Sequence, residues 1–316
     1  MLQELMFCID KVLPYFLIIL LGFVTSRRGY LSKEFFERSN HFVYTYALPL
    51  LIFRNCAFIQ WEGSDYSNLF IFQFVSIVLS VIIIWAFFEV ICRKQRHLIG
   101  TLVQGAYRGN YSVLALPIIA SVMGEESLGM ASLLNAVIVP IYNFSAVIVL
   151  QARGTQSGKM NFRNLSGQIM RNRLICSTML GVLVSLLPFR IPGPVDSALN
   201  MLGNTTAPLI LMVVGSMLKW DSSPGILWPT VLSCSIKALI LPAAMTFAAY
   251  SLGFRGTELY IVFASAAVPS AIASYSMAHA LGGDASLAAN ILCVTTLLSA
   301  FVIPIGTSAM RILGWI

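Results

Sequence analysis

The sequence has very little charge for its length. Of its 316 residues only 10% are charged and 58% are hydrophobic, whereas a soluble domain carries about 25% charged residues. A chain with so little polar material cannot cover the surface of a water-soluble fold. Apolar runs of roughly 20 residues recur along the whole chain instead, and a helix of that length crosses about 30 Å of hydrocarbon. The composition therefore indicates an all-α integral membrane protein.

The chain also lacks the motifs of several enzyme and ATP-driven classes. It has no CxxC pair, no GxxxxGK(S/T) loop, and no HExxH or GxGD pattern. His41, His97 and His279 fall near the ends of apolar runs, without a partner at metal-ligand spacing. We therefore expect no enzyme, no metal and no cofactor. The sequence leaves two interpretations of His279 open, namely a proton-coupling group and an interfacial side chain.

Ten apolar runs predict ten transmembrane helices. They lie near residues 5–25, 36–56, 67–91, 98–123, 127–150, 173–189, 195–218, 225–252, 257–281 and 286–312. The connections are short except for residues 151–172, which form a polar stretch. This pattern divides the chain into a first five-helix unit (1–150), a connecting loop (151–172) and a second five-helix unit (173–316).

Basic residues are distributed unequally between the two sides of the predicted bilayer. If the N-terminus faces outward, thirteen Lys and Arg residues fall in inward-facing connections and five in outward-facing ones. The positive-inside rule then places both termini on the extracytoplasmic side of the cell (inner or plasma) membrane, with the 151–172 loop in the cytoplasm. This topology accounts for the net charge of +7, so we expect no nucleic-acid partner.

The two units repeat short features in the same order and at one spacing. The pairs that match across 159 residues are Leu21-Gly22 with Leu180-Gly181, and Pro49-Leu50 with Pro208-Leu209. Because five spans is an odd number, the second unit must cross the bilayer in the opposite direction. Inverted repeats of this kind are typical of secondary transporters, whose substrate site lies near the midplane between the repeats.

The fourth and ninth spans carry the signals of discontinuous helices. The fourth reads GAYRGNYSVLALPI, with Gly109 and Pro117, and the ninth reads ASAAVPSAIASYS, with Pro269. Proline removes a backbone donor and clashes with the preceding turn. The freed polar groups are tolerated at membrane depth only where they are buried in protein or line a cavity. Equivalent positions in the two units favour broken helices at a functional site over two simple proline kinks, which are the alternative.

Two cations fall near the bilayer midplane. Arg108 lies about 11 residues past the inner end of the fourth span, and Lys237 about 12 past that of the eighth. The 13 carboxylates lie near span ends or in loops. Midplane cations without a midplane acid favour an anionic ligand. The alternative is that either cation contacts a backbone carbonyl or lies at a shallower depth.

Five segments together resemble the auxin efflux carrier family, which includes bacterial carriers and the plant PIN-type auxin carriers. The segments are Leu13–Leu31, Tyr46–Phe53, Gly109–Ile118, Gly203–Leu218 and Ala266–Ala278. The resemblance covers nearly the whole chain. It implies ten spans in two inverted five-helix repeats, with broken helices that cross in spans four and nine. It also implies elevator-like transport of organic anions such as carboxylates or auxin-like acids.

The resemblance further suggests individual site residues. Asn110 matches the asparagine that helps to hold the substrate carboxylate in PIN-type relatives. Where many relatives have asparagine shortly after the ninth-span proline, this chain has Ala273 followed by Ser274 and Tyr275. This departure favours a bacterial-type carboxylate carrier over an auxin carrier. The candidate substrate-binding residues are Asn110, Arg108, Lys237, Ser274 and Tyr275, and the candidate helix-break residues are Gly109, Pro117 and Pro269.

These features predict a secondary active transporter of small organic anions. A membrane-embedded solute sensor or receptor, using the same pocket without net transport, is the alternative, because a fold does not fix a function. The expected partners are the organic anion and the lipid bilayer. Protons or another ion as the coupling species, and assembly as a homodimer, stay open at this point.

The predicted topology can be tested by single-cysteine labelling. In a cysteine-free background, we expect Gly158→Cys in the 151–172 loop to react with a membrane-impermeant thiol reagent only from the cytoplasmic side, because of the positive-inside bias. Cysteines added at either terminus should react only from the opposite side. Labelling of Gly158→Cys from outside alone would overturn both the orientation and the number of spans.

Overall fold

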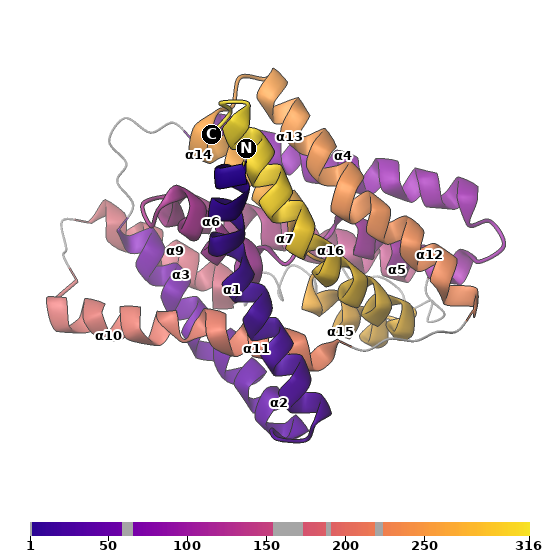
Figure 1. The fold of residues 1–316 in the computed structure, drawn as a ribbon, viewed down its shortest axis with the longest axis horizontal. Coiled ribbons are helices and arrows are strands. Elements are labelled where there is room, and N and C mark those ends of the chain that lie inside the picture. Colours follow the sequence, from indigo (N-terminus) through magenta and orange to yellow (C-terminus); the bar gives the residue numbers. More distant parts are fainter. Residues whose placement is uncertain (1, 59–65, 154–172, 188–190, 219–223) are drawn as a thin grey trace.

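A computed structural model describes the chain apart from residues 1, 59–65, 154–172, 188–190 and 219–223 (Figure 1). The described residues form helices and the turns between them, with no strand among them. The segments labelled η are π-helical. In chain order the helices are α1 (Leu2–Arg27), α2 (Lys33–Phe42), η1 (Val43–Ala47), α3 (Leu48–Ala57), α4 (Ser67–Ile91), α5 (Arg96–Tyr107), η2 (Tyr111–Ala115), α6 (Leu116–Met123), α7 (Ser127–Arg153), α9 (Arg173–Leu186), α10 (Gly193–Asn204), α11 (Thr206–Met217), α12 (Pro224–Ser235), η3 (Ile236–Ile240), α13 (Leu241–Ser251), α14 (Gly256–Ala267), α15 (Ile272–Ala280) and α16 (Ala285–Ile312).

Five helical stretches are long and apolar enough to cross a membrane. They are Ser67–Ile91, Ser127–Arg153, Gly193–Met217, Ile226–Ser251 and Ala285–Ile312. Three shorter apolar helices, within α1, η2–α6 and α9, accompany them. The prediction of an all-helical, multi-pass membrane protein is therefore confirmed. The ten-span inverted repeat stays a prediction, and most of the 151–172 loop lies outside the described residues.

The distribution of apolar side chains fits a lipid environment. On α4, the large side chains of Ile71, Ile82 and Ile83 are each more than half exposed. In water, a surface of this kind marks an interaction site or an aggregation hazard, whereas in a bilayer it is a lipid-facing surface. The centre of the molecule is formed by α5 and α14, which are buried over Leu98–Tyr107 and Leu259–Ala267. The first and last helices, α1 and α16, pack against each other (Figure 1).

Each π-helical segment immediately precedes a Leu-Pro pair. The pairs are Leu48-Pro49, Leu116-Pro117 and Leu241-Pro242. In each case the leucine N–H donates to the carbonyl five residues earlier, which belongs to Val43, Tyr111 and Ile236 respectively. A proline in a regular helix clashes with the carbonyl four residues before it. The wider turn relieves that clash without breaking the helix.

Two close helix contacts depend on glycine and follow the spacing seen in the sequence. A Cβ atom on Gly22 of α1 would collide with the backbone carbonyl of Met212 in α11, and a Cβ on Gly181 of α9 would meet that of Phe53 in α3. Gly181 lies 159 residues after Gly22, and Met212 lies 159 residues after Phe53. Small residues let membrane helices approach closely and so gain van der Waals contact.

These contacts predict a selective loss of stability. Gly22→Ala and Gly181→Ala should each lower the free energy of unfolding by about 1–3 kcal/mol, because the obstructing atoms are backbone and cannot rotate away. Gly193→Ala is the matched control, since nothing lies within 4 Å of its added Cβ. Thermal unfolding in detergent should rank both variants below this control. A Gly22→Ala protein as stable as the control would contradict the packing.

Candidate functional site

The fourth and ninth predicted spans are interrupted, and the two interruptions pair with each other. α5 ends at Tyr107 and η2 begins at Tyr111, while α14 ends at Ala267 and α15 begins at Ile272. Gly109 and Ser270 form an isolated antiparallel bridge. The backbone bonds are Asn110 N–H to Pro269 O at 2.9 Å and Ala271 N–H to Arg108 O at 3.2 Å. Backbone groups freed by each break thus find partners in the other break.

Local residue chemistry explains where the helices break. Pro269 has no N–H, and the preceding Val268 has the extended conformation (φ −62°, ψ 150°) that a following proline favours. Gly109 permits the close crossing, because a Cβ there would lie 2.7 Å from the Ser265 carbonyl oxygen. Pro117, in contrast, lies inside α6, seven residues after Asn110. Gly109 and Pro269 are therefore within the breaks, whereas Pro117 follows a π-helical turn.

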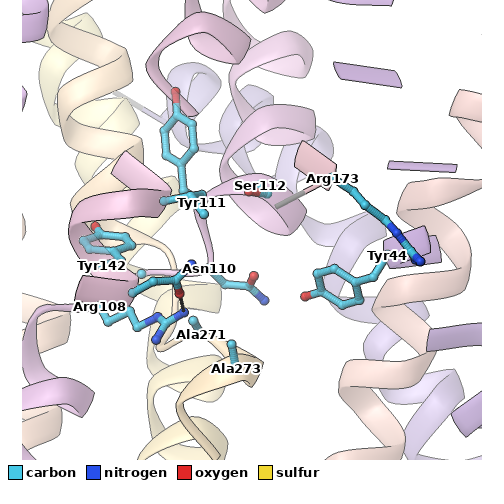
Figure 2. Close-up of a pocket in the computed structure, with 12 residues that line it drawn as sticks. Tyr44, Arg108, Asn110, Tyr111, Ser112, Tyr142, Arg173, Ala271 and Ala273 are labelled. Carbon is cyan, nitrogen blue, oxygen red and sulfur yellow. Dashed lines mark hydrogen bonds between the residues drawn. The ribbon is translucent and has the colours of Figure 1, made fainter. Parts of the chain in front are cut away.

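A cavity of about 320 Å³ lies beside this crossing (Figure 2). Among the described residues that line it, none is acidic and two are arginines. They are Tyr44, Arg108, Gly109, Asn110, Tyr111, Ser112, Val139, Tyr142, Asn143, Arg173, Ala271 and Ala273. In Figure 2 the Tyr44 hydroxyl and the Asn110 amide point toward one another.

Two buried N–H donors of the cavity wall lack a partner among the described residues. Arg108 is 5% exposed and donates from Nη2 to Asn143 Oδ1 at 2.7 Å and from Nη1 to Met277 Sδ at 2.8 Å. Its Nε has no partner, and neither has Asn110 Nδ2. A buried donor without an acceptor costs about 1–3 kcal/mol. Both groups are therefore suited to a ligand that supplies acceptor oxygens.

Lys237 lies behind the cavity wall and does not line it. Its Nζ, on η3, donates to the backbone oxygen of Ala266 at 2.6 Å, one residue before the end of α14. A Cβ on Gly109 would lie 3.1 Å from this Nζ, and Gly109 lines the cavity. A cation at a helix C-terminus is electrostatically favourable. Lys237 thus contacts a backbone carbonyl, which was the alternative to ligand binding. Its Nζ is nevertheless close enough to Gly109 for its charge to act on the cavity.

The two remaining candidates are not among the described residues that line this cavity. Ser274 is buried, and its carbonyl oxygen accepts from Gln104 Nε2 at 2.8 Å. Tyr275 is 38% exposed and lines a different cavity with Lys33 and Glu37. The structure therefore brings Arg108 and Asn110 together in one cavity wall, to which Ser274 and Tyr275 do not contribute.

The structure adds residues that sequence reasoning missed. Tyr44, Tyr142, Asn143 and Arg173 all line the cavity. A signal for Tyr44 was present, because the Ala-Leu-Pro triplet that begins at the last residue of η1 recurs at the last residue of η2, the segment that contains Tyr111 and Ser112. π-helical turns are frequent at functional sites. Arg173 was counted only as a topology signal.

Comparisons with known proteins identify the family of this chain. A family model described as membrane transport protein matches residues 7–169 and 161–307. The chain belongs to this family. It is the auxin efflux carrier family that the sequence motifs resemble, so that prediction is confirmed.

Similar proteins cover nearly the full length. An uncharacterized transporter of Methanocaldococcus jannaschii is 22% identical, over 97% of this chain and 98% of its own. The uncharacterized transporter YfdV of Escherichia coli is 24% identical, over 91% of this chain and 94% of its own. A Rhizobium meliloti protein named "Putative malonate transporter" is 24% identical, over 91% of both chains.

The cavity geometry predicts that the Tyr44 hydroxyl contributes to ligand binding. Tyr44→Phe removes a hydroxyl that faces Asn110 and should weaken ligand binding by about 0.5–1.5 kcal/mol, with little effect on stability. The control is Tyr107→Phe, whose hydroxyl donates to the Tyr142 carbonyl oxygen at 3.3 Å; this change should lower stability instead. Binding affinity and thermal unfolding, measured on both variants, separate the two outcomes. Equal affinities for Tyr44→Phe and wild type would remove this hydroxyl from the site.

Proposed function

We propose that this protein is a secondary active transporter of small organic anions, with carboxylates as the substrate class. The observation that carries the proposal is the wall of the cavity at the helix crossing. As far as the described residues go, this wall contains a buried guanidinium, two N–H donors without partners and no acidic residue. A carboxylate offers the acceptors that Arg108 Nε and Asn110 Nδ2 lack.

The surrounding electrostatics support an anion at this depth. The segments η2–α6 and α15 both begin at the crossing, and helix N-termini carry partial positive charge. Lys237 adds positive charge from behind Gly109 without contacting the ligand. Fixed positive charge lowers the cost of holding an anion in the membrane interior.

The proposed architecture is two inverted five-helix repeats that form two bodies. We assign α1–α3 and α9–α11 to one body, and α4–α7 and α12–α16 to the other. The paired glycine contacts at the 159-residue spacing support the repeat. The cavity lies at the boundary, since Tyr44 and Arg173 come from the first body and Arg108, Asn110 and Tyr142 from the second.

Alternating access between these two bodies is what the resemblance to the auxin efflux carrier family implies. The second body carries the helix crossing and would move against the first as an elevator, because packed interfaces switch between discrete arrangements. No nucleotide-binding loop is present in the sequence, so the proposed energy source is a gradient of protons or another ion. The proposed location is the cell membrane, with both termini on the extracytoplasmic side.

The printed name of the Rhizobium meliloti relative places malonate among the substrates to test. Purified protein in proteoliposomes should take up labelled mono- or dicarboxylates, including auxin-like acids in the panel, with and without a pH gradient. Binding of a carboxylate without uptake under any gradient would favour the sensor over the transporter. Selective uptake of neutral or cationic solutes would reject the anion proposal.

Asn110→Ala tests the site itself. It removes a donor in a buried wall and should weaken carboxylate affinity by about 1–3 kcal/mol, or roughly 5- to 150-fold. The matched control is Asn204→Ala, because Asn204 is exposed on α10. Affinity should be compared after both variants are shown to insert and fold. Unchanged affinity in Asn110→Ala would move the site away from the crossing.

A further inference from the structure

A groove between α4 and α7 takes no part in the helix crossing. Its volume is about 540 Å³, and its described lining residues are apolar apart from Ser145 and the indole N–H of Trp85. Both polar groups already have partners, because the Ser145 hydroxyl donates to the Ile141 backbone oxygen at 2.7 Å and Trp85 Nε1 donates to Glu89 at 2.9 Å. The groove therefore suits a hydrocarbon chain better than a polar solute.

The groove has the length of one lipid leaflet. Along α4 its lining extends from Phe74 to Trp85, which are eleven residues apart, or about 17 Å at the rise of a helix. Half of the hydrocarbon core of a bilayer is about 15 Å thick. Phe74 and Ile82 are each more than half exposed, so the groove opens toward the surrounding lipid. One acyl chain of a phospholipid therefore fits along it.

Positive charge gathers where the groove reaches the end of α4. Trp85 lies one helical turn before Glu89, and Arg153 Nε, at the end of α7, donates to this carboxylate at 2.6 Å. Arg96, the first residue of α5, interacts electrostatically with the same carboxylate. In the described residues at this end, one acidic side chain is accompanied by four basic ones, namely Arg93, Lys94, Arg96 and Arg153.

We propose that this groove binds one anionic phospholipid, with an acyl chain between α4 and α7 and the phosphate of the headgroup at Arg96 and Arg153. Basic pockets between membrane helices bind anionic headgroups in this way. A guanidinium has five N–H donors, of which Glu89 takes one here. Arg153 can therefore bond a phosphate oxygen while it keeps its ion pair. In the topology predicted from the basic residues, the lipid belongs to the cytoplasmic leaflet.

A second groove on α4 offers an internal comparison. It lies toward the other end of the helix, between α4 and residues 248–258, and its volume is about 720 Å³. Its described lining residues include the carboxylate of Glu258 and no basic side chain. A carboxylate repels an anionic headgroup, whereas a zwitterionic headgroup has no net charge. Charge, rather than size, therefore distinguishes the two grooves.

The probes are phosphatidylglycerol and phosphatidylcholine with identical acyl chains, added to the purified full-length protein. Bound lipid is counted by native mass spectrometry. We expect the first phosphatidylglycerol to bind about three- to tenfold more tightly than phosphatidylcholine. Arg96→Gln and Arg153→Gln should each lower this ratio, and the double variant should bring it close to one. Arg38→Gln is the matched control, because it removes the cation of another Arg–Glu pair at 2.6 Å, on α2.

A second pair of variants tests the position of the acyl chain. Ile82 and Leu79 are both at least half exposed on α4, but Ile82 lines the proposed groove and Leu79 lines the second one. Ile82→Trp should fill the groove and weaken phosphatidylglycerol binding about threefold or more, whereas Leu79→Trp should leave it unchanged. Thermal unfolding of both variants checks that each one folds.

Three results would overturn the proposal. They are equal affinity of the wild-type protein for the two lipids, a phosphatidylglycerol preference that survives in the double arginine variant, and unchanged binding in Ile82→Trp. A dimer that Ile82→Trp dissociates would also overturn it, because a second copy of the chain would then cover the groove. None of these measurements requires transport, so the proposed function is tested separately.

Discussion

Where a helix is interrupted inside a membrane protein, its freed backbone N–H and C=O groups must be paired within the protein. Here the two interruptions satisfy each other, through Asn110 N–H to Pro269 O and Ala271 N–H to Arg108 O. This pairing requires both breaks to meet at one point, with a glycine where the backbones approach most closely. The positions of the buried wall residues follow from it, because Arg108 and Asn110 flank that glycine in the chain.

The pairing also explains how much the sequence could predict. The helical membrane fold, the interrupted fourth and ninth spans, Gly109 and Pro269 in the breaks, and the Arg108–Asn110 neighbourhood depend on local signals, namely apolar length, proline, glycine and a charge at depth. Those signals are readable along one chain. They do not tell what a side chain faces, which is why Tyr275 was grouped with Asn110 although it lines a different cavity.

The residues that were missed depend on packing between distant segments. Tyr44 and Arg173 reach the cavity from η1 and α9, far in sequence from the crossing. Pro117 illustrates the opposite error, because a proline signal in the right span was assigned to the break. It follows a π-helical turn instead, in which the Leu116 N–H bonds to the Tyr111 carbonyl oxygen. Proline thus has two solutions in this fold, and the sequence alone does not say which applies.

The cations of the site are already satisfied to different degrees, and this decides what each can do for a ligand. Lys237 is bonded to the end of α14, so its charge acts at a distance. Arg108 has Asn143 and Met277 as partners, and its Nε–H has none among the described residues, so two bonds position the guanidinium before a ligand binds. A donor that is already held in place loses little conformational entropy when a ligand binds. A transporter must also release its ligand, and for the proposed anionic substrate a guanidinium that retains Asn143 and Met277 is not left unpaired when the anion departs. The buried position of Arg108 therefore strengthens its attraction for the proposed anion, and the bonds that it already makes limit how tightly the anion is held. This combination suits transient binding.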